Sequence, residues 1–76
     1  MNEKYLKVFM DSFGITEDKV KTLAYQDIPE WDSVGHMQMI ALIEESFDIM
    51  LDTDDIIDFS SFEKGKEILR KYDIKI

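Results

Sequence analysis

The chain has 76 residues, a net charge of −8 and no cysteine, and 45% of its residues are hydrophobic. This length predicts one small domain over residues 1–76, and the lack of thiols excludes disulfides, a cysteine nucleophile and a sulfur-based zinc site. The negative charge argues against nucleic acid as a partner, and no apolar run approaches the ~20 residues that span a bilayer.

The charges are segregated along the chain. All nine basic residues lie either at or before Lys21 or from Lys64 onward, whereas residues 22–63 contain eleven acidic residues and no basic one. A surface of one sign steers partners of the opposite sign, so this segregation predicts a protein partner with a basic patch. The N-terminal residues do not have the pattern of a secretory signal. We therefore expect a monomeric cytoplasmic protein that does not insert into membranes.

The first predicted helix covers residues 3–13, after Asn2 as a candidate N-cap, and ends where Gly14 can take a positive φ. Its apolar side chains recur at three- and four-residue spacing, which is typical of a helix with one buried stripe. The stripe is expected to contain Leu6, Phe9, Met10 and Phe13.

Residues 15–32 show weaker periodicity, and we interpret them as a long loop that includes a short helical turn near Thr16. Spaced apolar side chains are expected to pin this loop to the core. Pro29 biases the residue before it away from helical geometry. The expected pins are Ile15, Val20, Leu23, Ile28 and Trp31.

The strongest helical pattern covers Ser33–Phe47. Its inner face is predicted to contain Met39, Ile40, Ile43 and Phe47, with His36 one turn before Ile40. The side chains expected to face water are Gln38, Glu44, Glu45 and Asp48. Met37 and Ala41 lie at the boundary, where they would place apolar spots among the acidic residues.

Two further helices are predicted, a short one over residues 54–59 and a last one over residues 61–72. The side chains expected to point inward from the last helix are Phe62, Ile68, Leu69 and Tyr72. Gly65 inside this helix costs ~1 kcal/mol relative to alanine unless a close contact needs the space. Only the tail at 73–76 alternates as a strand would. The predicted fold class is therefore all-α, a small four-helix bundle of three longer helices and one short helix.

Ser33 is the residue with the clearest chemical interest. Its simplest role is that of an N-cap, which contributes ~1 kcal/mol. As a self-sufficient nucleophile it would need a base, a group that orients the base, and an oxyanion hole. His36 follows three residues later, but no Gly-x-Ser-x-Gly turn or matched acid partner is evident, so we expect a packed His36 and no enzyme activity. Two roles stay open: Ser33 either only caps the helix or presents its oxygen for modification.

The acidic residues match neither a metal site nor an acid–base pair. Counting Asp52 as the first position of a calcium loop, the turn glycine required at the sixth position is Ile57. Glu44 and Glu45 are adjacent on a helix and point ~100° apart, so they do not converge on one substrate atom. We expect no metal site and a solvated or partner-facing acidic surface.

The sequence Asp32-Ser33-Val34, followed by an amphipathic helix that ends Glu44-Glu45-Ser46-Phe47, resembles the acyl and peptidyl carrier protein family. The likeness covers nearly the whole chain, because Phe13-Gly14-Ile15 closes the first helix and an acidic stretch over residues 52–58 leads into the short one. In that family the motif is most often Asp-Ser-Leu. Its serine receives a 4′-phosphopantetheine arm from a separate phosphopantetheinyl transferase.

The resemblance implies that Ser33 is the attachment site of 4′-phosphopantetheine and that the arm carries acyl groups as thioesters to partner enzymes with basic patches. The residues expected to meet these partners are Asp32, Val34, Met37, Ala41, Glu44, Glu45, Ile56 and Ile57. Val34 in place of leucine, followed by Gly35-His36-Met37, departs from the main fatty-acid carriers and resembles discrete carriers of specialised pathways. A peptidyl or aminoacyl carrier and an unmodified acidic helical adaptor are the alternatives.

Overall fold

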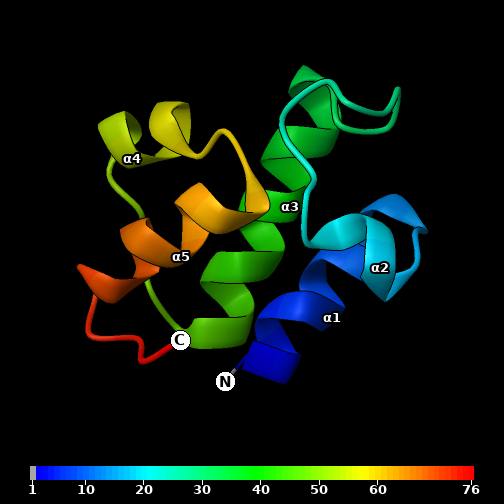
Figure 1. Cartoon of the computed structure of the whole chain (residues 1–76). Coiled ribbons are helices and arrows are strands. Elements are labelled where there is room, and N and C mark those ends of the chain that lie inside the picture. The colour runs from blue at the N-terminus through cyan, green and yellow to red at the C-terminus, as the bar shows by residue number, and fades with distance from the viewer. Residues whose placement is uncertain (1) are drawn as a thin grey trace.

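A computed structural model describes residues 2–76 as a small all-helical protein (Figure 1). The helices are α1 (Asn2–Phe13), α2 (Glu17–Val20), α3 (Ser33–Phe47), α4 (Thr53–Asp58) and α5 (Phe62–Arg70). In the view of Figure 1, α3 lies between the part formed by α1 and α2 and the part formed by α4 and α5. The predicted all-α bundle is confirmed, with α2 as the short turn expected near Thr16.

The core is built around the ring of Phe9, which has no exposed surface. Phe9 makes ring contacts with Tyr5, Phe13, Trp31, Phe59 and Phe62, at centroid distances from 5.1 to 6.2 Å. These partners come from α1, the α2–α3 loop, the α4–α5 loop and α5. One aromatic cluster therefore joins both ends of the sequence, and it gives this short chain a continuous core.

The buried face of α1 is turned from the predicted one. Phe9 and Phe13 are buried as expected, but Tyr5 and Val8 are also buried, whereas Leu6 and Met10 are only half-buried. Tyr5 can be buried because its hydroxyl donates a hydrogen bond of 2.7 Å to the carbonyl of Phe62. Burial raises the pKa of the Tyr5 phenol, which therefore stays a donor.

The structure explains Gly65 and corrects the end of α5. A side chain at Gly65 would overlap the Tyr5 hydroxyl and the ring of Phe59, so the close contact does need the space. α5 ends at Arg70 rather than at residue 72, since Asp73 takes a left-handed φ of 64°. The tail then folds back, with the Ile74 amide donating to the Leu69 carbonyl, and forms no strand.

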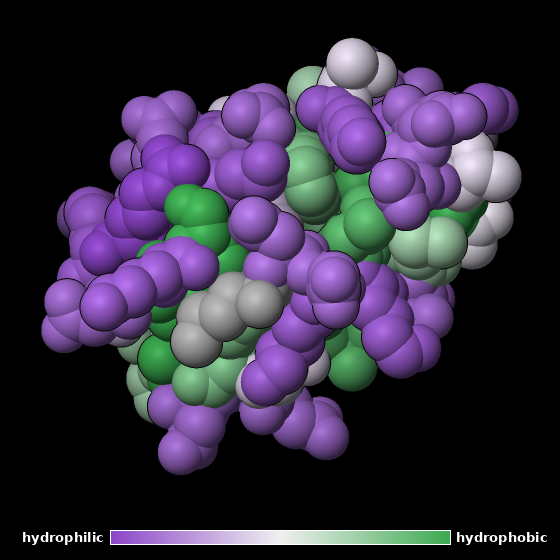
Figure 2. Space-filling view, turned by 60° about the horizontal axis from the view of Figure 1, so that its bottom comes forward, coloured by the Kyte–Doolittle hydropathy of each residue, from purple (hydrophilic) through white to green (hydrophobic). Residues whose placement is uncertain are grey.

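The ends of the described chain lie together at one end of the bundle. Asn2 and Ile76 line one surface hollow, while α3 begins at the opposite end (Figure 1). The face in Figure 2 is mostly hydrophilic, with small apolar areas between polar side chains. Within residues 2–76 no helix is long and apolar enough to cross a membrane.

Candidate functional site

The first turn of α3 corrects the expected cap. Asp32, not Ser33, is the N-cap: its backbone is extended and its carboxylate accepts a 2.8 Å hydrogen bond from the Gly35 amide. Trp31, with no exposed surface, fixes the chain immediately before this point, so Asp32 meets the cap position and Ser33 is already helical. The Ser33 hydroxyl is consequently not committed to the backbone.

Gly35 allows the preceding loop to lie directly against this turn. A Cβ atom at Gly35 would overlap the carbonyl oxygen of Glu30, and it would also come close to the Asp32 carboxylate. The loop therefore reaches α3 only because position 35 has no side chain. This close approach helps to hold Asp32 and Ser33 in their positions.

Ser33 is exposed and lies at the rim of an apolar pocket of about 340 Å³. The other residues that line the pocket are Tyr25, His36, Met37, Ile56, Ile57, Phe59 and Ser60. The Ser33 hydroxyl oxygen is 3.3 Å from the hydroxyl oxygen of Tyr25. The structure thus places the exposed Ser33 hydroxyl beside a hollow between α3, α4 and the loop that carries Tyr25.

Both ring nitrogens of His36 are engaged in hydrogen bonds with other parts of the fold. Its Nδ1 accepts a 2.9 Å hydrogen bond from the Trp31 indole, so its proton lies on Nε2 and is donated to the Ile56 carbonyl at 2.8 Å. The ring is half-buried and stacks on Trp31 at an interplanar angle of 14°. The prediction of a packed His36 is confirmed, and its use of both nitrogens brings α4 against α3.

A second polar cluster holds the first turn of α4. The buried Asp55 carboxylate accepts hydrogen bonds from Lys71 at 2.5 Å and from the Tyr72 hydroxyl at 2.6 Å. The same Tyr72 hydroxyl accepts from the Asp52 amide at 2.9 Å. The bonds from Lys71 and Tyr72 lower the pKa of Asp55, and the bond to Asp55 raises the pKa of Lys71.

The residues expected to meet partners are apolar side chains on α3, apolar side chains on α4, and acidic side chains. Val34, Met37 and Ala41 are exposed along one side of α3, with exposed fractions of 65% for Val34 and 52% for Met37. On α4, Ile57 is 72% exposed and Ile56 is half-buried. The residues that the structure brings to the pocket together with Ser33 are Met37, Ile56 and Ile57.

The acidic members of this set differ from one another. Asp32 and Glu45 are exposed, whereas Glu44 is half-buried, because its carboxylate accepts a 2.9 Å hydrogen bond from the Leu51 amide. The expectation that Glu44 faces water is therefore only partly met. Part of its role is to hold the loop that follows α3.

Sequence reasoning did not identify Tyr25, Phe59 or the Asp55 cluster. Tyr25 and Phe59 are each more than seven residues from Ser33, so helix periodicity carries no signal for their contact. Asp55 did carry a signal, since it lies four residues before the apolar Phe59, a spacing that places two side chains on one face of a helix. Within residues 2–76 no group of three or more His, Asp or Glu side chains is arranged to hold a metal ion.

Comparison of the chain with protein-family models, with curated proteins and with solved structures finds no match. The function is therefore inferred from the residues and the geometry around Ser33.

Proposed function

We propose that this chain is an acyl carrier protein, in which Ser33 accepts a 4′-phosphopantetheine arm from a separate phosphopantetheinyl transferase. One observation carries the proposal: Asp32 caps α3, which leaves the Ser33 hydroxyl exposed at the first residue of the helix. A serine used as the cap would have its oxygen bonded to a backbone amide. The chain offers the hydroxyl, and the catalytic groups belong to the enzymes that modify and load it.

The position of Ser33 suits a phosphodiester. Its oxygen would form the new bond to phosphorus, the bond from phosphorus to the donor's leaving group would break, and the hydroxyl proton would pass to a base of the transferase. The amides of the first turn of α3 and the positive end of its dipole favour an anion there. The arm supplies the thiol for thioesters, which this cysteine-free chain does not have.

The surface around Ser33 suits transient partners of opposite charge. The exposed stripe of Val34, Met37 and Ala41 offers apolar contact, and Asp32 and Glu45 add negative charge beside it. Such complementarity raises association rates and still allows release. We infer that enzymes with basic patches bind here. These would include the phosphopantetheinyl transferase and the enzymes that load and transfer the acyl group.

The pocket at Ser33 favours an acyl cargo over an aminoacyl one. Its aliphatic walls are Met37, Ile56 and Ile57, and the fully buried Phe59 contributes to its lining. An apolar group on a folded-back arm would lose contact with water against these side chains. A peptidyl or aminoacyl carrier is the second candidate. Loading with a more polar cargo would support it.

Intact-protein mass spectrometry tests the proposal directly. The protein is incubated with coenzyme A and a phosphopantetheinyl transferase of broad carrier specificity, and we expect the mass to rise by one prosthetic group. Ser33→Ala should abolish the increase. Ser46→Ala is the matched control, because it removes a serine at the other end of α3 and should leave the modification intact.

The contrary outcome is equally clear. If the wild-type mass does not change under conditions that fully modify a known carrier, the carrier proposal is wrong. An acidic helical adaptor that binds a basic protein without any arm would then be the better description. In that case Ser33→Ala would leave partner binding unchanged.

A further inference from the structure

We propose that Tyr25 is a positioning residue for Ser33: its phenol favours one orientation of the Ser33 hydroxyl at the rim of the pocket. The two hydroxyl oxygens lie 3.3 Å apart, and Ser33 follows Tyr25 by eight positions in the sequence. This inference rests on the proposed function for its purpose, because it concerns how Ser33 is presented for modification. The geometry that supports it is independent of the arm.

The ring of Tyr25 is held by its neighbours. It meets Trp31 edge-on at a centroid distance of 6.3 Å and an interplanar angle of 85°, and it meets His36 at 5.7 Å and 72°. Both neighbours are themselves fixed, since the Trp31 indole donates to His36 and Trp31 is fully buried. The phenol therefore projects toward Ser33 from a rigid base.

The backbone at Tyr25 is held from two sides. The Tyr25 amide donates a 2.8 Å hydrogen bond to the Ser60 carbonyl, beside an isolated bridge between Ala24 and Ser61. On the other side, the next amide, that of Gln26, donates to the Trp31 carbonyl at 3.1 Å. These bonds attach the loop to the α4–α5 connection and to the residue just before the α3 cap.

The contact leaves Ser33 available for reaction. Its oxygen separation is longer than the 2.7–2.8 Å usual for a bond between two hydroxyls, so the restraint is mild. No other side-chain hydrogen bond of Tyr25 or Ser33 occurs within residues 2–76. When the Tyr25 phenol is the donor, the contact selects a side-chain rotamer of Ser33 and leaves the serine proton for the transferase base.

The first test uses the unmodified protein. Three-bond couplings between the α and β protons of Ser33 report its χ1 rotamer by nuclear magnetic resonance. We expect one dominant rotamer in the wild type and averaged couplings in Tyr25→Phe, which loses only the hydroxyl. Tyr72→Phe loses a phenol bonded elsewhere and should keep the wild-type couplings. Equal couplings in wild type and Tyr25→Phe would overturn the inference.

The second test measures the modification rate. Tyr25→Phe should lower kcat of the transferase by about two- to fivefold with KM for the carrier unchanged, because a weak hydrogen bond is lost at the reacting atom. A rise in KM alone would mean that Tyr25 contacts the enzyme rather than Ser33, and would overturn the inference. If the wild type is never modified, the carrier proposal fails, while the rotamer measurement still decides the role of Tyr25.

Discussion

At the scale of single residues, His36 connects three parts of the chain through one ring. It accepts from the Trp31 indole, donates to the Ile56 carbonyl and contacts the ring of Phe59 at 6.3 Å. Ile56 lies in the last turn of α4, where carbonyl groups have no partner within the helix. His36 therefore caps the end of α4 from another helix.

Substitution His36→Ala should destabilise the protein strongly. It leaves the Trp31 indole and the Ile56 carbonyl without partners, at a cost of about 2–4 kcal/mol in the free energy of unfolding. That is a large share of the roughly 4–11 kcal/mol expected for a domain of this length. Urea unfolding followed by the fluorescence of Trp31, the single tryptophan, measures the loss.

The neighbouring Gln38 supplies the control for this experiment. Its side chain is exposed on the same helix, and Gln38→Ala should change the free energy of unfolding by less than about 0.5 kcal/mol. A His36→Ala protein as stable as Gln38→Ala would show that the two hydrogen bonds of His36 contribute little.

At the scale of elements, α4 is held in place by contacts with other parts of the chain. It has six residues, and no side chain forms its N-cap hydrogen bond. The Asp55 cluster holds its first turn and His36 holds its last. Isolated helices this short are unstable in water, so α4 keeps its place through these two attachments.

The attachment at Asp55 predicts a dependence of α4 on pH. The pKa of Asp55 is lower in the folded protein than its ordinary value of 3.8, so its contribution is present above that value. The contribution is lost as the pH falls through the lowered pKa, because a protonated Asp55 no longer accepts from Lys71 and Tyr72 as a carboxylate. Below about pH 4, amides of α4 should exchange with solvent before those of α3.

Hydrogen-exchange mass spectrometry at stepped pH values measures this order of opening. Asp55→Asn removes the titrating group and should make exchange in α4 fast at neutral pH and nearly independent of pH in the acid range, after correction for intrinsic exchange rates. Simultaneous opening of α3 and α4 in the wild type at every pH would contradict the prediction.

Helix periodicity was sufficient to place the main elements, since each helix must bury one apolar face whatever its partners are. It predicted the bounds of α3, Ser33–Phe47, without error. It could not decide between Asp32 and Ser33 as the cap, because both are good caps and the burial of Trp31 decides between them. The contact of Tyr25 with Ser33 depends on the path of a loop, which has no sequence period.

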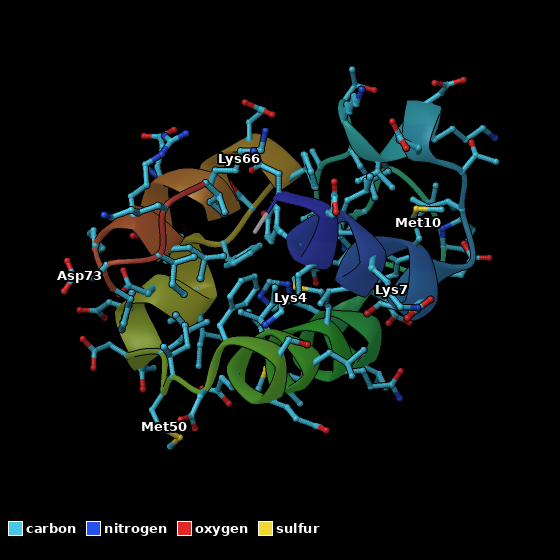
Figure 3. The ribbon with its side chains drawn as sticks, turned by 90° about the horizontal axis from the view of Figure 1, so that it is seen from below. Lys4, Lys7, Met10, Met50, Lys66 and Asp73 are labelled. Carbon is cyan, nitrogen blue, oxygen red and sulfur yellow. The ribbon has the colours of Figure 1, made fainter. Side chains whose placement is uncertain are left out.

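At the scale of the whole molecule, charge is distributed unevenly. The acidic segment 22–63 contains α3 and α4, whereas the basic residues lie on α1, on or just after α2, and from α5 onward. Figure 3 shows two of them, Lys4 and Lys7, on α1. Lys4 donates to the Ser46 carbonyl at 2.9 Å, which ties α1 to the end of α3. Lys4 thus serves the fold, as Asp32 and Glu44 do through their bonds to backbone amides, whereas Glu45 is exposed on α3.

Glu45 tests the acidic surface more cleanly than Glu44. Glu45 is exposed, whereas reversal of Glu44 would also break its bond to the Leu51 amide. We expect Glu45→Lys to slow the modification of Ser33 by about two- to tenfold at low salt. The difference should shrink at 1 M salt, where the Debye length falls to about 3 Å. Reactions quenched at timed intervals are analysed by mass spectrometry, and the increase of the modified fraction with time gives the rates.

Glu67→Lys is the matched control for net charge. Glu67 is exposed on α5, outside the acidic segment, and the substitution changes the total charge by the same amount. If both variants slow the reaction equally, net charge alone controls association. If neither does, the acids of α3 do not guide the transferase.

The position of the chain ends determines how Ser33 would be oriented in an attached or fused form of the protein. Residues 2 and 76 border one hollow, and α3 starts at the far end of the bundle, about 22 Å away along the length of that helix. A tether, a fusion or a solid support joined to either end would point Ser33 outward. With such an attachment, the bundle would act as a spacer between the support and Ser33.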